Sequence, residues 1–368
     1  MSARLVYSPG MDRHACKVVV IAGERSAQHV RSHIEERIDA VPRLTRRLDP
    51  APGPAAWVAD ADFSLDRHVT SRGALDDAGL RELIGELMAT PLDRERPLWT
   101  MDVVTLLPGE RTALVWRLHH SIADGRAAMA TAQVLLLDPS REEPPRRPPG
   151  PAPPTAASAP RKAADRRREV AFLDAPLEEL RRIGRAGRER ASVDDVALSA
   201  VGGGVRTWLE QLGAPAEGLR VKVPVSVHLA SDDSFMLIDL PLDHDDPLAR
   251  LAAVTRETSL GRYTRRSAMS PRVFTLNVSH VAGPADPQRV MGAPLLELHW
   301  LAEVAHRRAL RVTIVSAAGR ISFGLCADPD SIDGLGLIAD GIAREIAALG
   351  RAADGPRASG LVSSLGRG

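Results

Sequence analysis

The stretch RTALVWRLHHSIADGR, residues 111–126, joins an apolar run to two adjacent histidines, an aspartate and a glycine. The run predicts a strand. Asp124-Gly125 predicts a loop, in which the aspartate fixes the conformation and the glycine allows close approach to another backbone. A neutral imidazole, whose unperturbed pKa is about 6.5, accepts a proton near physiological pH when a partner holds its pose. We therefore favour a catalytic base over two alternatives, a turn of hydrogen-bonded histidines and a metal site. No metal is expected, because no third ligand lies nearby in the sequence.

Composition narrows the class of protein. A chain of 368 residues predicts two domains, and an apolar fraction of 44% supports sizeable cores. Lys and Arg number 48 against 47 Asp and Glu, a balance that argues against nucleic acid as a partner. Cys16 and Cys326 lie far apart without ligand spacing, so neither a disulfide framework nor structural zinc is expected.

The sequence carries no sign of export or of a membrane span. Its first residues lack the apolar stretch of a secretory signal, and no run approaches the roughly 18 apolar residues that span a bilayer. The expected location is the cytoplasm, with peripheral contact to a membrane or lipid droplet left open.

A proline-rich segment divides the chain. Residues 141–160 contain eight prolines and hardly any large apolar side chain, so they predict an extended linker. We divide the sequence into an N-terminal domain (1–140), a linker (141–165), a C-terminal domain (166–352) and a tail (353–368).

Helices and strands mix in both halves. Amphipathic periodicity predicts helices over residues 27–41, 75–89, 127–137, 176–190, 191–212 and 333–350, with Ser192 as an N-cap. Apolar runs predict strands over residues 16–23, 99–107, 111–118, 219–227, 234–242, 272–281, 311–319 and 320–327. The pattern indicates an α/β protein with large mixed sheets.

Several motifs resemble one family. HHxxxDG, here residues 119–125, resembles the motif of the chloramphenicol acetyltransferase-like acyltransferases. Further segments are similar to those of bacterial wax ester synthases/acyl-CoA:diacylglycerol acyltransferases: PLDRERPLW (91–99), FSLDRHV (63–69), VDDVALSAVGGGVRTWL (193–209), HVAGP (280–284) and VTIVSAAGRISFGL (312–325). The resemblance covers residues 15–350 approximately, in the order of the family.

This resemblance implies a fold, a reaction and residue roles. The fold would be a pseudo-dimer of two acetyltransferase-like domains with a channel between them. An acyl group would pass from acyl-CoA to a long-chain alcohol or diacylglycerol, as in wax ester and triacylglycerol synthesis. Acyl-CoA would be a co-substrate, and no permanently bound cofactor is implied. His120 would be the general base, Asp124 would hold the loop, and His119 would be a neighbour without an assigned role.

Other residues have weaker predictions. Pro97 and Trp99 suit structural support, and Arg96 is a candidate partner for a buried carboxylate such as Asp124. Gly203, in the run Gly202–Gly204, allows either close helix packing or approach of a ligand, and packing is favoured.

The resemblance also suggests roles at the domain interface or channel. Asp195 either serves a helix N-terminus or lies at that interface. His280, in HVAGP, stands where the family usually has asparagine. Asp194, in VDDVALSAVGGGVRTWL, also replaces an asparagine of the family. Both positions therefore bear on the acceptor site.

Three other functions remain open. The acceptor could be a polar or natural-product hydroxyl or amine. The chain could be a condensation-type domain that uses acyl groups on a carrier protein. It could also be a non-catalytic lipid-binding relative, although the intact HHSIADG argues against that.

Overall fold

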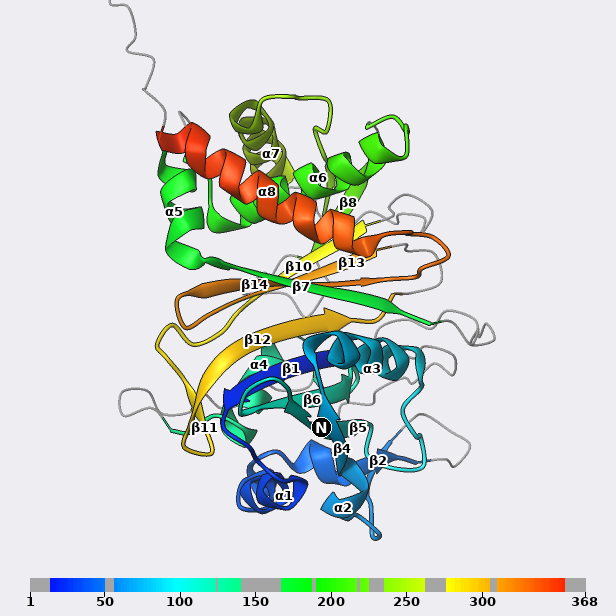
Figure 1. Cartoon of the computed structure of the whole chain (residues 1–368). Helices are drawn as coiled ribbons and strands as arrows, with labels where there is room; N and C mark the ends of the chain where they lie inside the picture. The colour runs from blue at the N-terminus through cyan, green and yellow to red at the C-terminus, as the bar shows by residue number, and fades with distance from the viewer. Residues whose placement is uncertain are drawn as a thin grey trace, which may run out of the picture.

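The computed structural model describes residues 14–49, 56–123, 125–139, 167–186, 190–216, 219–224, 235–261, 276–304 and 310–354. Two six-stranded sheets lie one above the other, with one group of helices above the upper sheet and another around the lower sheet (Figure 1). The predicted α/β class with large mixed sheets is confirmed. Most of the predicted linker and tail lies outside the described residues.

The first sheet has the strand order β11-β12-β1-β6-β5-β4. Its strands are β1 (His14–Ala22), β4 (Val69–Leu75), β5 (Trp99–Leu106), β6 (Arg111–His119), β11 (Arg289–Val290) and β12 (Ala293–Ala302). Only the β4–β5 pair is parallel within this sheet. The strand of the opening motif, β6, is therefore central, between β1 and β5.

The second sheet has the order β7-β14-β13-β10-β8-β9. Its strands are β7 (Glu169–Pro176), β8 (Arg220–Pro224), β9 (Phe235–Asp239), β10 (Leu276–Ala282), β13 (Leu310–Ala317) and β14 (Arg320–Ala327). Strand β10 runs parallel to both β13 and β8, so the sheet is mixed. A separate ribbon pairs β2 (Arg46–Leu48) with β3 (Trp57–Ala59).

The helices cover both sheets. They are α1 (Ala27–Glu35), α2 (Leu65–His68), α3 (Asp77–Ala89), α4 (Gly125–Leu135), α5 (Leu177–Ala186), α6 (Val193–Gln211), α7 (Pro247–Gly261) and α8 (Leu335–Asp354). The predicted helix 27–41 is too long. Two 3₁₀ segments, Ile38–Ala40 and Pro42–Thr45, follow α1. Val41 between them is not helical, because a residue before proline is disfavoured in helical conformation.

Strand β12 links the two halves. It belongs to the C-terminal part of the sequence, yet it pairs with β1 from Ala15↔Ala302 to Ile21↔Leu295. The two sheets also approach closely, since a Cβ at Gly324 of β14 would lie 2.0 Å from the carbonyl oxygen of Trp300. Neither β12 nor α7 was predicted, and the sheets do not follow the division of the sequence at the proline-rich segment.

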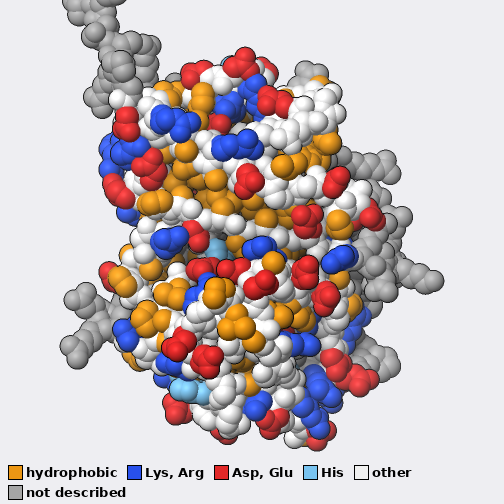
Figure 2. Space-filling view, viewed as in Figure 1, with side chains coloured by type: hydrophobic (Ala, Val, Ile, Leu, Met, Phe, Trp, Pro, Cys, Tyr) orange, Lys and Arg blue, Asp and Glu red, His pale blue; other side chains and the backbone are white. Residues whose placement is uncertain are grey.

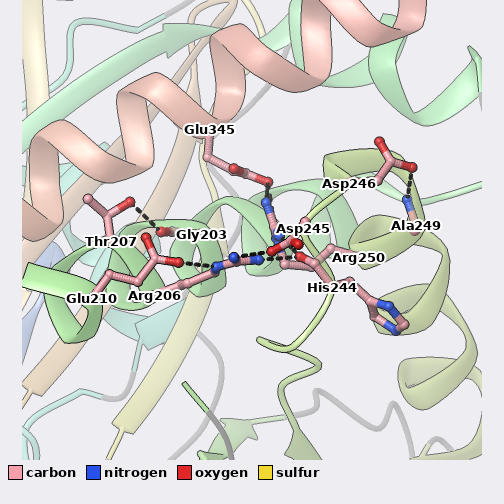
Figure 3. A network of polar contacts seen from close by, with 10 residues as sticks. All are labelled: Gly203, Arg206, Thr207, Glu210, His244, Asp245, Asp246, Ala249, Arg250 and Glu345. Carbon is pink, nitrogen blue, oxygen red and sulfur yellow. Dashed lines mark hydrogen bonds and ion pairs between the residues drawn. The ribbon is translucent and has the colours of Figure 1, made fainter. Parts of the chain in front are cut away.

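The upper helices pack tightly on one another. A Cβ at Gly203 would lie 2.5 Å from Glu345, and one at Gly204 would lie 2.7 Å from the carbonyl oxygen of Ile338, so α6 and α8 touch along the glycines. Beside this crossing, Glu345 of α8 accepts hydrogen bonds from Arg250 of α7 (Figure 3). This buried ion pair joins α7 to α8, and Glu345 also packs against Gly203 of α6.

Candidate active site

The HHxxxDG loop lies between β6 and α4. His119 ends β6, and its backbone N–H donates to the carbonyl of Leu98 (3.0 Å). The N–H of Ile122 donates to the carbonyl of His119 (2.9 Å), which turns the chain toward α4. Both histidines are half-buried, whereas Ile122 is buried in the core. Asp124 lies outside the described residues.

The ring of His119 is fixed by its own loop. The backbone N–H of Ser121 donates to its Nδ1 (3.1 Å), and the Ser121 hydroxyl lies 2.6 Å from the same atom. Because a backbone N–H can only donate, Nδ1 is an acceptor and neutral His119 carries its proton on Nε2. The hydrogen bonds therefore give His119 one tautomer and one orientation.

A third histidine stands beside the motif. His14 of β1 is directly opposite His119 of β6, and its side chain is buried. Burial, followed by the nearby guanidinium of Arg117, lowers the pKa of His14 from 6.5 to about 3. His14 is consequently neutral at physiological pH, and no sequence motif pointed to it.

The PLDRERPLW segment supports the motif directly. Trp99 is fully buried at the start of β5, paired with Leu118, and its indole N–H donates to the carbonyl of Leu44 (2.7 Å). His68, from the FSLDRHV segment, stacks on Trp99 at 4.6 Å and lies 2.8 Å from its carbonyl oxygen through Nδ1. Pro97 accepts from the Trp99 N–H (2.8 Å). Segments distant in the sequence thus meet next to the histidines.

Arg96 forms an ion pair with Asp93. Its Nε lies 3.4 Å from Oδ2 of Asp93, and both side chains are largely exposed. The suggested pairing with Asp124 involves a residue outside the described part of the chain.

Two contacts that the sequence did not reveal hold the loop. Arg43 donates from Nη1 to the carbonyl of Ile122 (2.9 Å). At the start of α4, a Cβ on Gly125 would lie 3.1 Å from Val281 of β10, so the loop touches the second sheet there. Glycine at this position allows the close approach that the sequence suggested.

The remaining predicted residues lie in the second half. Asp195 is buried and forms a capping box with Ser192, and it accepts a hydrogen bond from Thr258 of α7 (2.6 Å). Its contacts are those of helix capping and packing, and those of Gly203 are packing contacts with α8. His280, at the end of β10, contacts Asp194 and Ser316.

An unpredicted lysine lies inside the first sheet. Lys17 of β1 is buried with Nζ 5.1 Å from the ring centre of Trp116 and 4.9 Å from that of Trp300. Burial lowers its pKa to about 8. Among the described residues, its Nζ has no hydrogen-bond partner. The faces of the Trp116 and Trp300 rings therefore interact with its charge through cation–π contacts.

A recess of about 230 Å³ lies between the two halves. Its lining includes Val18, Leu80, Phe172, Asp174, Glu297 and His299, and neither motif histidine lines it. Acidic side chains gather at this junction in Figure 2. His299 stacks on Phe172 at 4.6 Å, and its Nε2 lies 3.1 Å from Glu297.

The side chains described in the structure include no group of three or more His, Cys, Asp or Glu suited to a metal ion. Nor does any described helix have the length and hydropathy of a membrane span.

Comparison with known proteins identifies the family. Residues 12–225 match the wax ester synthase/diacylglycerol acyltransferase catalytic domain, and residues 262–350 match the WS/DGAT C-terminal domain. A probable diacylglycerol O-acyltransferase of Mycobacterium tuberculosis is 30% identical, with 95% of this chain and 94% of that protein covered. A putative diacylglycerol O-acyltransferase of Mycobacterium bovis matches equally well.

Solved structures agree at the level of the fold. The wax ester synthase/diacylglycerol acyltransferase of Marinobacter aquaeolei VT8 has a TM-score of 0.72 at 21% identity, with 94% of this chain and 96% of that one covered. The SgcC5 protein of Streptomyces globisporus has a TM-score of 0.55 at 14% identity, with 96% and 95% covered. With both family domains and all the motif segments in order, the chain belongs to the wax ester synthase/diacylglycerol acyltransferase family.

Proposed function

We propose that this acyltransferase moves a fatty acyl group from a CoA thioester to the hydroxyl of a long-chain alcohol or diacylglycerol, with His120 as general base. The observation that carries the proposal is the position of the HHxxxDG loop. It follows a central strand and reaches the second sheet at Gly125, in a chain whose relatives are named diacylglycerol O-acyltransferases.

The proposed reaction needs one base and no covalent enzyme intermediate. Neutral His120 removes the proton of the acceptor hydroxyl while its oxygen attacks the thioester carbonyl carbon. The carbon–sulfur bond then breaks, and the imidazolium returns the proton to the CoA thiolate. Neutral His14, opposite His119 at the start of the loop, adds no positive charge there.

The surroundings of His120 suit a positioned base. His119 is held by Ser121, and Arg43 holds the carbonyl of Ile122, so both sides of the loop are fixed. We assign Asp124 the role of holding the loop and not of relaying protons. Positioning of this kind matters because a base acts only within hydrogen-bond reach of the proton that it removes.

The substrates set the partners of the protein. Acyl-CoA is a co-substrate, and the proposal includes no permanently bound cofactor or metal. Long-chain alcohols and diacylglycerol reside in lipid phases, so peripheral contact with a membrane or lipid droplet forms part of the proposal. We propose that the acyl and acceptor chains meet in a channel between the two halves.

The test replaces one histidine at a time. His120→Ala should lower kcat/KM for ester formation from radiolabelled acyl-CoA by about a hundredfold or more, the usual contribution of a general base. His29→Ala, on the exposed face of α1, is the matched control and should keep full activity. Both variants should unfold at the temperature of the unmodified chain.

The outcomes separate the open functions. Ester formed with hexadecanol or dioleoylglycerol supports the proposal, whereas ester or amide formed only with polar acceptors corrects the acceptor class. Transfer that persists in folded His120→Ala refutes the assignment of the base. Absence of transfer from CoA with every acceptor refutes acyl-CoA as the donor, and transfer from a carrier-bound acyl group instead would favour the condensation-type alternative.

A further inference from the structure

Three side chains outside the HHxxxDG loop contact one another in series. The Ser316 hydroxyl oxygen lies 3.0 Å from Nε2 of His280, and Nδ1 of His280 contacts Oδ1 of Asp194. A hydroxyl, an imidazole and a carboxylate joined through opposite ring nitrogens form the arrangement that activates serine nucleophiles on several unrelated folds. It is recognised by geometry and not by sequence position.

The topology explains why these residues meet. Strands β10 and β13 are parallel, with His280 beside Ile314 and Ala282 beside Ser316. His280 and Ser316 therefore lie near the carboxyl ends of two neighbouring strands, where α6 begins with Asp194 in its first turn. Such an edge, next to a helix N-terminus, is where α/β sheets commonly bind ligands.

The hydrogen bonds assign the protons. A carboxylate can only accept, so Nδ1 of His280 carries the proton toward Asp194. The lone pair of Nε2 then faces Ser316, whose hydroxyl donates to it. This tautomer is the one in which an imidazole can remove the proton of a serine.

The group is open to solvent. The side chain of His280 is 22% exposed and that of Asp194 is 67% exposed, while Ser316 is half-buried. An imidazole with solvent access can exchange the proton that it takes from a serine hydroxyl.

We propose that Ser316, His280 and Asp194 form a second, nucleophilic site that hydrolyses acyl esters or thioesters. Ser316 Oγ bonds to the carbonyl carbon while its proton passes to Nε2 of His280. The bond to the alkoxide or thiolate breaks, and that leaving group takes the proton. Water then attacks the acyl-serine, His280 removes its proton and returns it to Ser316 Oγ, and the free acid leaves.

This site is independent of the transfer proposed for His120. Val281 and Ala317, the next residues on the same strands, are buried in the cluster that also contains Met129 of α4. His280 and Ser316 point to the opposite face, because side chains alternate along a strand. The two activities can therefore be tested separately.

The test labels the serine with an alkyl fluorophosphonate, which needs neither CoA nor an acceptor. Tryptic digestion should release VTIVSAAGR, residues 312–320, in which Ser316 is the only serine. We expect one phosphonate on Ser316 and hydrolysis of p-nitrophenyl butyrate. His280→Asn and Ser316→Ala should lower both rates at least tenfold, and Asp194→Asn should lower the labelling rate as well.

Two controls make the result specific. Ser279→Ala, on β10 beside His280, should label at the unmodified rate, and His120→Ala should also label normally even though it loses acyl transfer. The proposal is overturned if Ser316 of the folded, unmodified chain takes no label. It is equally overturned if His280→Asn labels at the same rate, because the serine would then act without the imidazole.

Discussion

The buried ion pair between Arg250 and Glu345 permits a quantitative prediction of stability. Their side chains are 4% and 10% exposed, with Nη2 and Oε1 2.6 Å apart, and Arg250 also donates to the carbonyl of His244 (Figure 3). Arg250→Met leaves a carboxylate buried without its partner. The expected loss is about 3–5 kcal/mol in the free energy of unfolding, and Glu345→Leu should cost a similar amount.

The double variant distinguishes this reasoning from a simple loss of contacts. Arg250→Met/Glu345→Leu removes both desolvation costs, and the carbonyl of His244 keeps a donor in Arg206. It should therefore be more stable than either single variant.

The measurement is urea unfolding at neutral pH, followed by tryptophan fluorescence. Arg220→Met is the control, since Arg220 and Asp239 are also 2.6 Å apart but 39% and 58% exposed. It should cost at most about 1 kcal/mol. A double variant whose loss equals the sum of the two single losses would refute the reasoning.

Two further predictions concern the lower half. Burial lowers the pKa of Lys17 from its unfolded value of 10.5 to about 8 in the folded protein. Between these two pH values the unfolded state binds the proton and the folded state does not, so the free energy of unfolding rises with pH. Urea unfolding should therefore show that Lys17→Met is more stable than the unmodified chain by about 3 kcal/mol at pH 7 and by about 1 kcal/mol at pH 9.5. Any cation–π stabilisation of Lys17 reduces the difference at pH 7. Arg43→Met should lower kcat for acyl transfer about tenfold with little change in KM for acyl-CoA, because only the hold on Ile122 is lost; an unchanged kcat in steady-state assays would contradict this role.

Local patterns predicted the elements that depend on local chemistry. The strands β5, β6, β13 and β14 come from apolar runs, and Ser192 caps α6 as expected. Strand β12 was missed because Glu297 and His299 interrupt its apolar pattern. Both side chains line the recess between the sheets, a setting that only the tertiary structure creates.

The candidate site was predicted only where its residues lie in recognisable local motifs. The histidines and the PLDRERPLW segment carry recognisable motifs, and the structure brings them together at Leu98 and Trp99. Arg43 and His14 come from distant segments without a motif. His280 and Asp194 were each noted as departures from the family, but their contact depends on the register of β10 with β13 and on where α6 starts.

Strand β12 has a consequence for how the protein is made. One of the two partners of strand β1 is β12, which is synthesised long after β1. Until then β1 presents an unpaired, apolar edge, the kind of edge to which other chains add. Most of the chain separates Ala22 of β1 from Ala293 of β12, so this pairing forms slowly compared with local hairpins such as β5–β6. We therefore expect a fragment cut at the proline-rich segment to expose this edge of β1 and to aggregate.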